Sequence, residues 1–386
     1  MNPVLKATQH LERAGRYVTQ PAGYRIFMPK PLPPVPALSL EGNLQQRLSI
    51  ADRALGRLDG SVTTLPNPDL FVYMYVRKEA VLSSQIEGTQ SSLQDLLSAE
   101  ALLAEGVPRD VDEVVNYVRT MHAGLARLRQ IPVSTRLIRE MHRSLLQGMR
   151  GAQLTPGELR RTQTWIGPPG STLATASFVP PPPPDLARLL GDVETFLHRD
   201  DDLPLLIKIG LAHAQFETIH PFLDGNGRIG RLLITFLLCE REALGQPVLY
   251  LSHYFKRHRQ QYYDRLQAVR DEGDWEGWLT FFLTGVAEVA LEAAETARQI
   301  LVLRETHRNL ITDRLGRVAG HGHRVLERLY QKPIVSVDDV RGITATSFPA
   351  ANDVVQRLVD LEILREITGR ARNRRFRYDP YVDLFA

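Results

Sequence analysis

The chain has 386 residues, of which 43% are hydrophobic and 24% are charged, and its 47 basic and 44 acidic residues leave a formal net charge of +3. This composition excludes a disordered or collagen-like chain, and the length favours two or three globular domains. The first six residues lack the order of a signal peptide, and no apolar run approaches about 18 residues, so we expect neither export nor a membrane span. The single cysteine, Cys239, cannot form an intrachain disulfide, which favours a cytoplasmic location.

The N-terminal part is predicted to be helical after a proline-rich lead. Residues 29–38 contain repeated prolines and are expected to be extended. Apolar spacing near 3.6 then predicts helices at 44–58, 70–87, 91–104, 111–128 and 135–149. We assign residues 1–105 to an N-terminal helical region.

The pattern breaks between residues 156 and 184, where three glycines and five consecutive prolines surround short β-type pieces at 164–166 and 177–179. These features predict a β-hairpin flap over a site. Helical periodicity returns at 184–198, 204–219, 226–243, 257–270 and 275–303. Residues 106–300 are therefore expected to form a core domain.

Shorter units follow from about residue 318. Helices are expected at 322–330, after a capping box at 336–339, and from 346 to 361, while 363–368 and 374–378 have β-type composition. Three helices and a β-hairpin predict a C-terminal winged helix-turn-helix over residues 301–386. The whole chain is expected to be mainly α.

The segment 220–231, His-Pro-Phe-Leu-Asp-Gly-Asn-Gly-Arg-Ile-Gly-Arg, concentrates groups suited to phosphoryl chemistry. Pro221 disfavours helical geometry at His220, so the preceding helix should present His220 at its end. The imidazole titrates near neutral pH and can take a proton from a hydroxyl group. Asp224 offers a hard oxygen ligand suited to Mg²⁺, although an N-cap is an equally simple role for it.

Backbone amides form the second part of this segment. Gly225, Asn226 and Gly227 allow positive φ angles and a close backbone approach, so that N–H groups can converge on an anion. Arg228 and Arg231 lie three residues apart in the first turn of the next helix, where the macrodipole disfavours cations. The two guanidinium groups therefore require a nearby anion, which the phosphates of a nucleotide would supply.

The opposite anomaly occurs at Glu87, an anion that should lie at a helix C-terminus because Gly88 has the position of a capping glycine. Glu87 is expected to pair with Arg231 or Arg228, although an exposed helix end would need no partner.

These residues carry a resemblance to a known family. Residues 220–231 resemble in full the H-P-F-x-D-G-N-G-R-x-x-R motif of Fic proteins, and Ser83-x-x-x-Glu87-Gly88 resembles their [S/T]-x-x-x-E-[G/N] inhibitory motif. The resemblance covers about residues 30–300, and the C-terminal part resembles the winged helix found on some members. It implies a nucleotidyltransferase that moves AMP from ATP to Ser, Thr or Tyr hydroxyls of target proteins, including itself.

The resemblance also implies roles for individual residues. His220 would be the base, Asp224 would hold Mg²⁺, and Glu87 would inhibit by pairing with Arg231. The other implied nucleotide-binding residues are Ile166, Gly167, Gly225, Asn226, Gly227, Arg228, Arg231, Tyr262 and Tyr263. For the two tyrosines, simple packing remains open. The flap at 166–183 would dock the target protein by strand addition.

Alternatives stay open at this stage. The core could be a nucleotide-sensing domain of a transcriptional regulator, since six arginines against one acid between residues 364 and 378 suit DNA phosphates. A solvated hairpin or a dimer contact would explain the same arginines. AMP removal, with Glu87 positioning a water, is a third alternative. The target, the activating signal and the oligomeric state are not set by the sequence.

Overall fold

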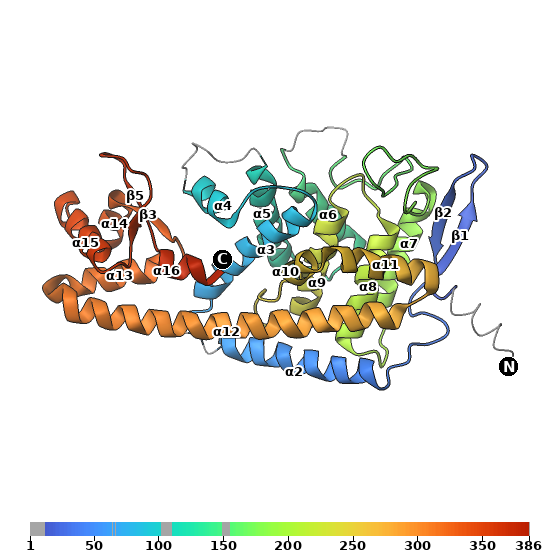
Figure 1. Ribbon diagram of the computed structural model, residues 1–386, viewed down its shortest axis with the longest axis horizontal. Coiled ribbons are helices and arrows are strands. Elements are labelled where there is room, and N and C mark those ends of the chain that lie inside the picture. Colours follow the sequence, from blue (N-terminus) through green and yellow to red (C-terminus); the bar gives the residue numbers. More distant parts are fainter. Residues whose placement is uncertain (1–11, 64, 66, 102–109, 149–154, 386) are drawn as a thin grey trace.

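The computed structural model describes residues 12–63, 65, 67–101, 110–148 and 155–385, and the fold is mainly helical (Figure 1). The described chain begins with an antiparallel hairpin of β1 (Gly15–Thr19) and β2 (Arg25–Pro29), which sequence analysis did not predict. β2 lies against the predicted flap, because the Phe27 amide donates to the Val179 carbonyl at 2.9 Å. The proline-rich segment that follows is not helical, as expected.

The core is a bundle of helices above a long supporting pair (Figure 1). The bundle comprises α3 (Asp69–Ile86), α4 (Leu93–Glu100), α5 (Val111–Leu128), α6 (Thr135–Leu145), α7 (Leu186–His198), α8 (Leu205–Ile219), α9 (Asn226–Glu240), α10 (Ser252–Arg257) and α11 (Arg259–Glu272). α8 and α9 are buried along almost their whole length, so they form the centre of the bundle. The helix expected at 257–270 is α11, shifted by two residues, whereas α10, which ends at Arg257, was not predicted.

The supporting pair is α2 (Asn43–Thr63) and α12 (Trp275–Leu315), which lie side by side along the molecule (Figure 1). α12 was expected to end at residue 303, but it continues to Leu315 and crosses the predicted domain boundary at 301 without a break. By length and composition the stretch Trp275–Leu329 contains an 18-residue window apolar enough to cross a membrane, with a mean hydropathy of 1.2. Since 67% of its most apolar window is buried inside the protein, these side chains serve as core.

The C-terminal unit contains α13 (Ala319–Leu329), α14 (Val337–Thr344), α15 (Phe348–Asp360) and a sheet of β3 (Ile334–Ser336), β5 (Arg375–Arg377) and β4 (Arg365–Glu366) in that order. Both strand pairs are antiparallel. The predicted capping box is present, because Ser336 accepts from the Asp339 amide and Asp339 accepts from the Ser336 amide.

The end of the chain returns to the core. After β5, α16 (Asp379–Val382) and a 3-10 turn (Asp383–Phe385) bring Phe385 against α3, with ring centroids 5.5 Å from Tyr75 and 6.4 Å from Phe71. α3 is therefore in contact with both the bundle and the C-terminal segment, and its own C-terminus carries Glu87.

Candidate active site

His220 is presented where α8 ends. It adopts left-handed backbone angles of φ +48° and ψ +61°, and its amide still donates to the Phe216 carbonyl at 3.0 Å. Pro221 explains the end of the helix, as predicted. Arg160, only 1% exposed, holds this geometry from outside: its Nε donates to the His220 carbonyl at 2.9 Å, and its amide donates to the Pro221 carbonyl at 3.0 Å.

The electrostatics keep the His220 imidazole neutral. Burial, with the nearby Arg160 guanidinium, lowers the pKa of His220 to about 4. Its Nδ1 atom is buried and has no hydrogen-bond partner among the described residues. The ring is therefore in the form that can accept a proton at neutral pH.

The loop after His220 is held by its own side chains. Asn226 Oδ1 accepts from the Phe222 amide and Asn226 Nδ2 donates to the Phe222 carbonyl, both at 2.9 Å. His142 stacks on the Phe222 ring with centroids 3.7 Å apart, accepts from the Gly157 amide and contacts the Asp224 carbonyl at 3.0 Å. The Asn226 side chain thus shapes the loop, and its amide atoms are already in use.

The two arginines at the start of α9 form ion pairs with different carboxylates. Arg228 contacts Asp224 at 3.1 Å and Glu113 at 2.9 Å. Arg231 donates to Glu87 Oε1 at 2.7 Å, while its Nε donates to the Ser83 hydroxyl at 2.8 Å. Both guanidinium groups are 3% exposed or less, whereas the side chains of their carboxylate partners are 27–49% exposed.

Glu87 reaches Arg231 from the end of α3. Glu87 is the C-cap residue and Gly88 has φ +108°, as the sequence indicates for a capping glycine. Burial alone would raise the pKa of Glu87, but attraction to Arg231 outweighs it and holds the pKa below its usual value. A Cβ atom on Gly227 would lie 2.2 Å from Glu87 Oε1, so only glycine permits this approach.

These groups border one cavity of about 1000 Å³. The predicted residues in its lining are Glu87, Ile166, Gly167, His220, Gly227, Arg231, Tyr262 and Tyr263. Asp224, Gly225, Asn226 and Arg228 lie in the adjoining loop and helix start. The segment predicted to be a flap borders the cavity, where Ile166 and Phe178 exchange two backbone hydrogen bonds in an isolated antiparallel bridge.

The two tyrosines differ in environment. Tyr262 is 1% exposed, and its hydroxyl contacts His213 Nε2 at 2.9 Å, while its ring stacks on Phe255. Tyr263 is 39% exposed. Tyr262 is thus a packed residue at the cavity wall, and Tyr263 is the one open to a ligand.

Several cavity residues were missed by sequence reasoning. Glu217 lines the cavity with a buried, unpartnered Oε1 atom, and burial raises its pKa to about 7. Arg270 also lines it, with its guanidinium 3.8 Å from the centre of the Phe178 ring. Glu217 could have been identified from sequence, because it lies three residues before His220. Arg160 and Arg270 lie at no regular spacing from the motif, so no sequence signal identifies them.

Two family models match the part of the chain that contains this site. Residues 45–126 match the family described as Fic/DOC family N-terminal, and residues 132–238 match the Fic/DOC family. The second match contains His220, Asp224 and both arginines of α9. Residues 45–126 and 132–238 of the chain therefore resemble Fic/DOC family domains.

Curated relatives share this part of the chain. It is 35% identical over 144 residues to the Protein adenylyltransferase Fic of Culex quinquefasciatus, covering 37% of this chain and 25% of the relative. The protein of the same name from Drosophila grimshawi is 33% identical over 156 residues, covering 40% and 29%. The chain therefore spans about a quarter of the length of the curated relatives it matches.

Two solved structures share the fold. A Fic family protein from Desulfovibrio desulfuricans G20 superposes with a TM-score of 0.59 at 18% identity, covering 88% of this chain and 97% of that chain. A Fic domain containing signaling protein from Bacteroides thetaiotaomicron VPI-5482 gives a TM-score of 0.50 at 18% identity, covering 66% and 95%.

Proposed function

We propose that this protein is an autoinhibited adenylyltransferase that moves AMP from ATP to Ser, Thr or Tyr hydroxyls of target proteins and of itself. The name of the curated relatives supports the reaction class. The observation that carries the proposal is that neutral His220 and Arg231 line one cavity of nucleotide size while Glu87 is bound to Arg231.

The position of each residue in the cavity determines its role in the reaction. Arg231 and the amides at the start of α9 bind the β- and γ-phosphates, because a helix N-terminus and a guanidinium both attract anions. The α-phosphorus then lies near His220. The target hydroxyl passes its proton to the imidazole as its oxygen attacks the α-phosphorus, and pyrophosphate leaves.

Mg²⁺ fits this arrangement through Asp224. Within the described residues, no group of three His, Cys, Asp or Glu side chains could hold a metal without help. The Asp224 side chain is 49% exposed, and Mg²⁺ usually binds one or two carboxylates together with substrate phosphates and water. Bound there, the ion would neutralise charge on the phosphates.

Inhibition follows from competition for Arg231. The Arg231 Nη2 atom donates to both Glu87 and the Ser83 carbonyl, so a γ-phosphate must displace Glu87 to use it. Such a contact weakens productive ATP binding without closing the whole cavity.

Target docking is assigned to the flap. Trp165 and Ile166 are 43% and 37% exposed beside the bridge to Phe178, so an extended target segment could add to this edge. The same site could remove AMP, since the Glu87 carboxylate lines the cavity with His220 and could orient a water.

We also propose that the C-terminal unit, in which α13, β3, α14, α15, β4 and β5 follow one another, is a winged helix. Its arginines give limited support to a DNA-binding regulator, because Arg365 and Arg377 pair with Asp379, and Arg375 pairs with Asp339. We therefore rank the transferase above a DNA-binding regulator.

Labelled ATP tests the proposal. Incubation with ATP labelled at the α-phosphate should label the Glu87→Gly variant more than the wild type, and the Glu87→Gly, His220→Ala double variant should stay unlabelled. Absence of label in all three proteins, with lysate added as a source of targets, would refute the transferase. Incubating pre-labelled protein with wild type and Glu87→Gly tests AMP removal, which requires that only the wild type releases the label.

A further inference from the structure

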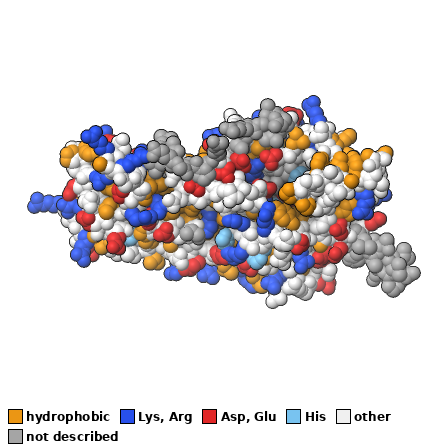
Figure 2. Space-filling view, turned by 45° about the horizontal axis from the view of Figure 1, so that its top comes forward, with side chains coloured by type: hydrophobic (Ala, Val, Ile, Leu, Met, Phe, Trp, Pro, Cys, Tyr) orange, Lys and Arg blue, Asp and Glu red, His pale blue; other side chains and the backbone are white. Residues whose placement is uncertain are grey.

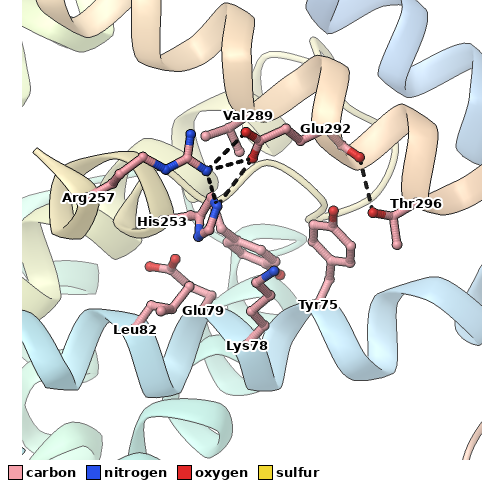
Figure 3. A pocket seen from close by; sticks show the side chains of 10 residues that line it. Tyr75, Lys78, Glu79, Leu82, His253, Arg257, Val289, Glu292 and Thr296 are labelled. Carbon is pink, nitrogen blue, oxygen red and sulfur yellow. Dashed lines mark hydrogen bonds and ion pairs between the residues drawn. The ribbon is translucent and has the colours of Figure 1, made fainter. Parts of the chain in front are cut away.

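Two adjoining cavities flank α3 outside the nucleotide site. The first, of about 230 Å³, lies between α3, α10 and α12 and is lined mainly by polar side chains (Figure 3). Lys78 and Glu79 come from α3, His253 and Arg257 from α10, and Glu292 from α12. The second, of about 390 Å³, shares Lys78, Leu82 and His253 with the first.

Glu79 makes the first cavity a built polar site. The residue is 2% exposed, and its Oε1 atom accepts from the Tyr117 hydroxyl at 2.8 Å and the Ser252 hydroxyl at 2.6 Å. Its Oε2 atom is buried and has no partner among the described residues. Burial raises the pKa of Glu79 to about 7, so the group can offer a carboxylic acid proton to a ligand.

Lys78 provides the charge. It is half-buried, and its ammonium group has no hydrogen bond or ion pair within the described part of the chain, while burial lowers its pKa. Arg257 and His253 share the single carboxylate of Glu292, at 3.0 and 3.3 Å. Lys78 is attracted to the Glu292 carboxylate but forms no ion pair with it among the described residues. An ammonium group with unused donors, next to an acid that can be protonated, is suited to a carboxylate.

The second cavity is suited to a hydrocarbon chain. Apolar side chains line much of it: Val81 and Leu82 from α3, Leu93 from α4, and Val382 and Phe385 from the end of the chain. The cavity thus touches α3, α4 and the C-terminal segment together. Its lining includes Gln85, two residues before Glu87.

We propose that these cavities bind a small amphipathic carboxylate, with its head at Lys78 and Glu79 and its chain between α3 and the C-terminal segment. The site is present in the state where Glu87 contacts Arg231, and a ligand that fits one state shifts the population toward it. The ligand therefore strengthens inhibition. This last step rests on the proposed function, whereas binding itself does not.

Octanoate is the probe for binding, measured by titration calorimetry without ATP. The wild type should bind octanoate more tightly than octylamine or octanol. Lys78→Met, which keeps the apolar stem, should weaken octanoate about tenfold by removing a charged hydrogen bond. Lys30→Met is the matched control, because Lys30 is exposed on the β1–β2 hairpin and should leave binding unchanged. Failure of octanoate to bind, or equal loss in both variants, would overturn the site.

Hydrogen exchange tests the coupling without catalysis. Octanoate should slow amide exchange over residues 83–90 in the wild type and leave the rate unaltered in Lys78→Met. At ten times its Kd, octanoate should also lower self-modification of the wild type about tenfold but barely change that of Glu87→Gly. Binding without slower exchange would refute the link to Glu87. If no variant is ever labelled, the proposed function fails while the calorimetric result still decides the site.

Discussion

Arginines crowd two places in this chain, the start of α9 and the strands β4 and β5, and their partners differ in the two places. Arg231 is paired with Glu87, which lies 144 positions earlier in the chain, and a cavity of about 1000 Å³ adjoins the pair. Arg365 and Arg377 are paired with Asp379, which belongs to the same small unit. On the face shown in Figure 2, basic and acidic side chains are likewise interspersed.

The comparison teaches that a density of positive charge does not identify a ligand site. The six arginines between residues 364 and 378 are more numerous than the two of α9, yet half of them already face carboxylates. What distinguishes α9 is that its two arginines lie at the helix end that disfavours cations and that Arg231 borders a cavity. Another anion, such as a phosphate, can therefore replace the Glu87 carboxylate at Arg231.

The largest expected difference between the two regions is in their response to acid. Burial lowers the pKa of His142 and His220 to about 4 and that of His213 to about 3. Because the unfolded pKa is near 6.5, stability from these groups is complete above pH 6.5 and is lost as the pH falls toward 4. Burial raises the pKa of Glu79 and of Glu217 to about 7, so the folded state binds their protons more tightly than the unfolded state does. These two groups therefore stabilise the protein as the pH falls and offset part of the loss.

Three histidines against two carboxyl groups leave a net loss of about 2–5 kcal/mol between pH 6.5 and 4. In the C-terminal unit, burial alone would raise the pKa of Asp379, but the hydrogen bonds and charges of Arg377 and Arg365 together outweigh it and lower the pKa. Stability there is therefore lost only below about pH 3.8. Hydrogen exchange at pH 7, 5.5 and 4.5 should therefore show α8 and α9 losing protection before β5. The reverse order would contradict the assigned shifts.

The second prediction concerns Arg160, the residue that fixes the backbone around His220. In the Glu87→Gly background, Arg160→Met should lower the kcat of labelling about 100-fold, because a displacement of about 1 Å at the base is enough for such a loss. The KM for ATP should change little, since Arg160 does not contact the phosphate end of the cavity. Arg161→Met is the control: Arg161 is exposed and has no ion pair with the described residues. An equal loss of kcat in the Arg160→Met and Arg161→Met variants would show that Arg160 does not position His220.

The contrast between Arg160 and Arg231 shows what the sequence could reveal. Glu87 was expected from sequence to pair with Arg231 or Arg228 because each of these residues opposes its own helix dipole, which is a property of residue type and position, and the family resemblance selected Arg231. Arg160 was not identified because its partners are backbone carbonyls, which every residue possesses. His142 was missed for the same reason, since its hydrogen bonds go to the Gly157 amide and the Asp224 carbonyl.

The helices show a similar limit. α5 was predicted at its observed bounds because it has one apolar face, whereas the β1–β2 hairpin was missed because its strands are short and pair outside the bundle. The extension of α12 to Leu315 was also missed, because the expected break near residue 303 is overridden by packing against the C-terminal unit, where His307 contacts the Tyr378 hydroxyl at 2.8 Å.

The third prediction tests whether the C-terminal arginines are structural. Asp379→Asn should destabilise the C-terminal unit by about 1–3 kcal/mol, because it removes a charge shared by Arg365 and the buried Arg377. Asp338→Asn is the control, since its 3.3 Å pair with Arg341 is exposed and should contribute less than about 1 kcal/mol. Denaturant unfolding followed by proteolysis within residues 319–385 measures both. Equal stability of the two variants would mean that Asp379 does not hold the strands.

The smallest expected effect concerns DNA. Each phosphate neutralised on a duplex adds about 0.9 to the slope of log K against log salt, so all six arginines together would give a slope of about 5. Because Arg365, Arg375 and Arg377 already face carboxylates, the slope should not exceed about 3. Fluorescence anisotropy of a labelled duplex between low and moderate salt measures this value, and Arg372→Glu should lower it by about 1. A slope near 5 would show that DNA displaces Asp339 and Asp379 from their arginines. The C-terminal arginines would then resemble Arg231, because in both places a phosphate could replace the carboxylate.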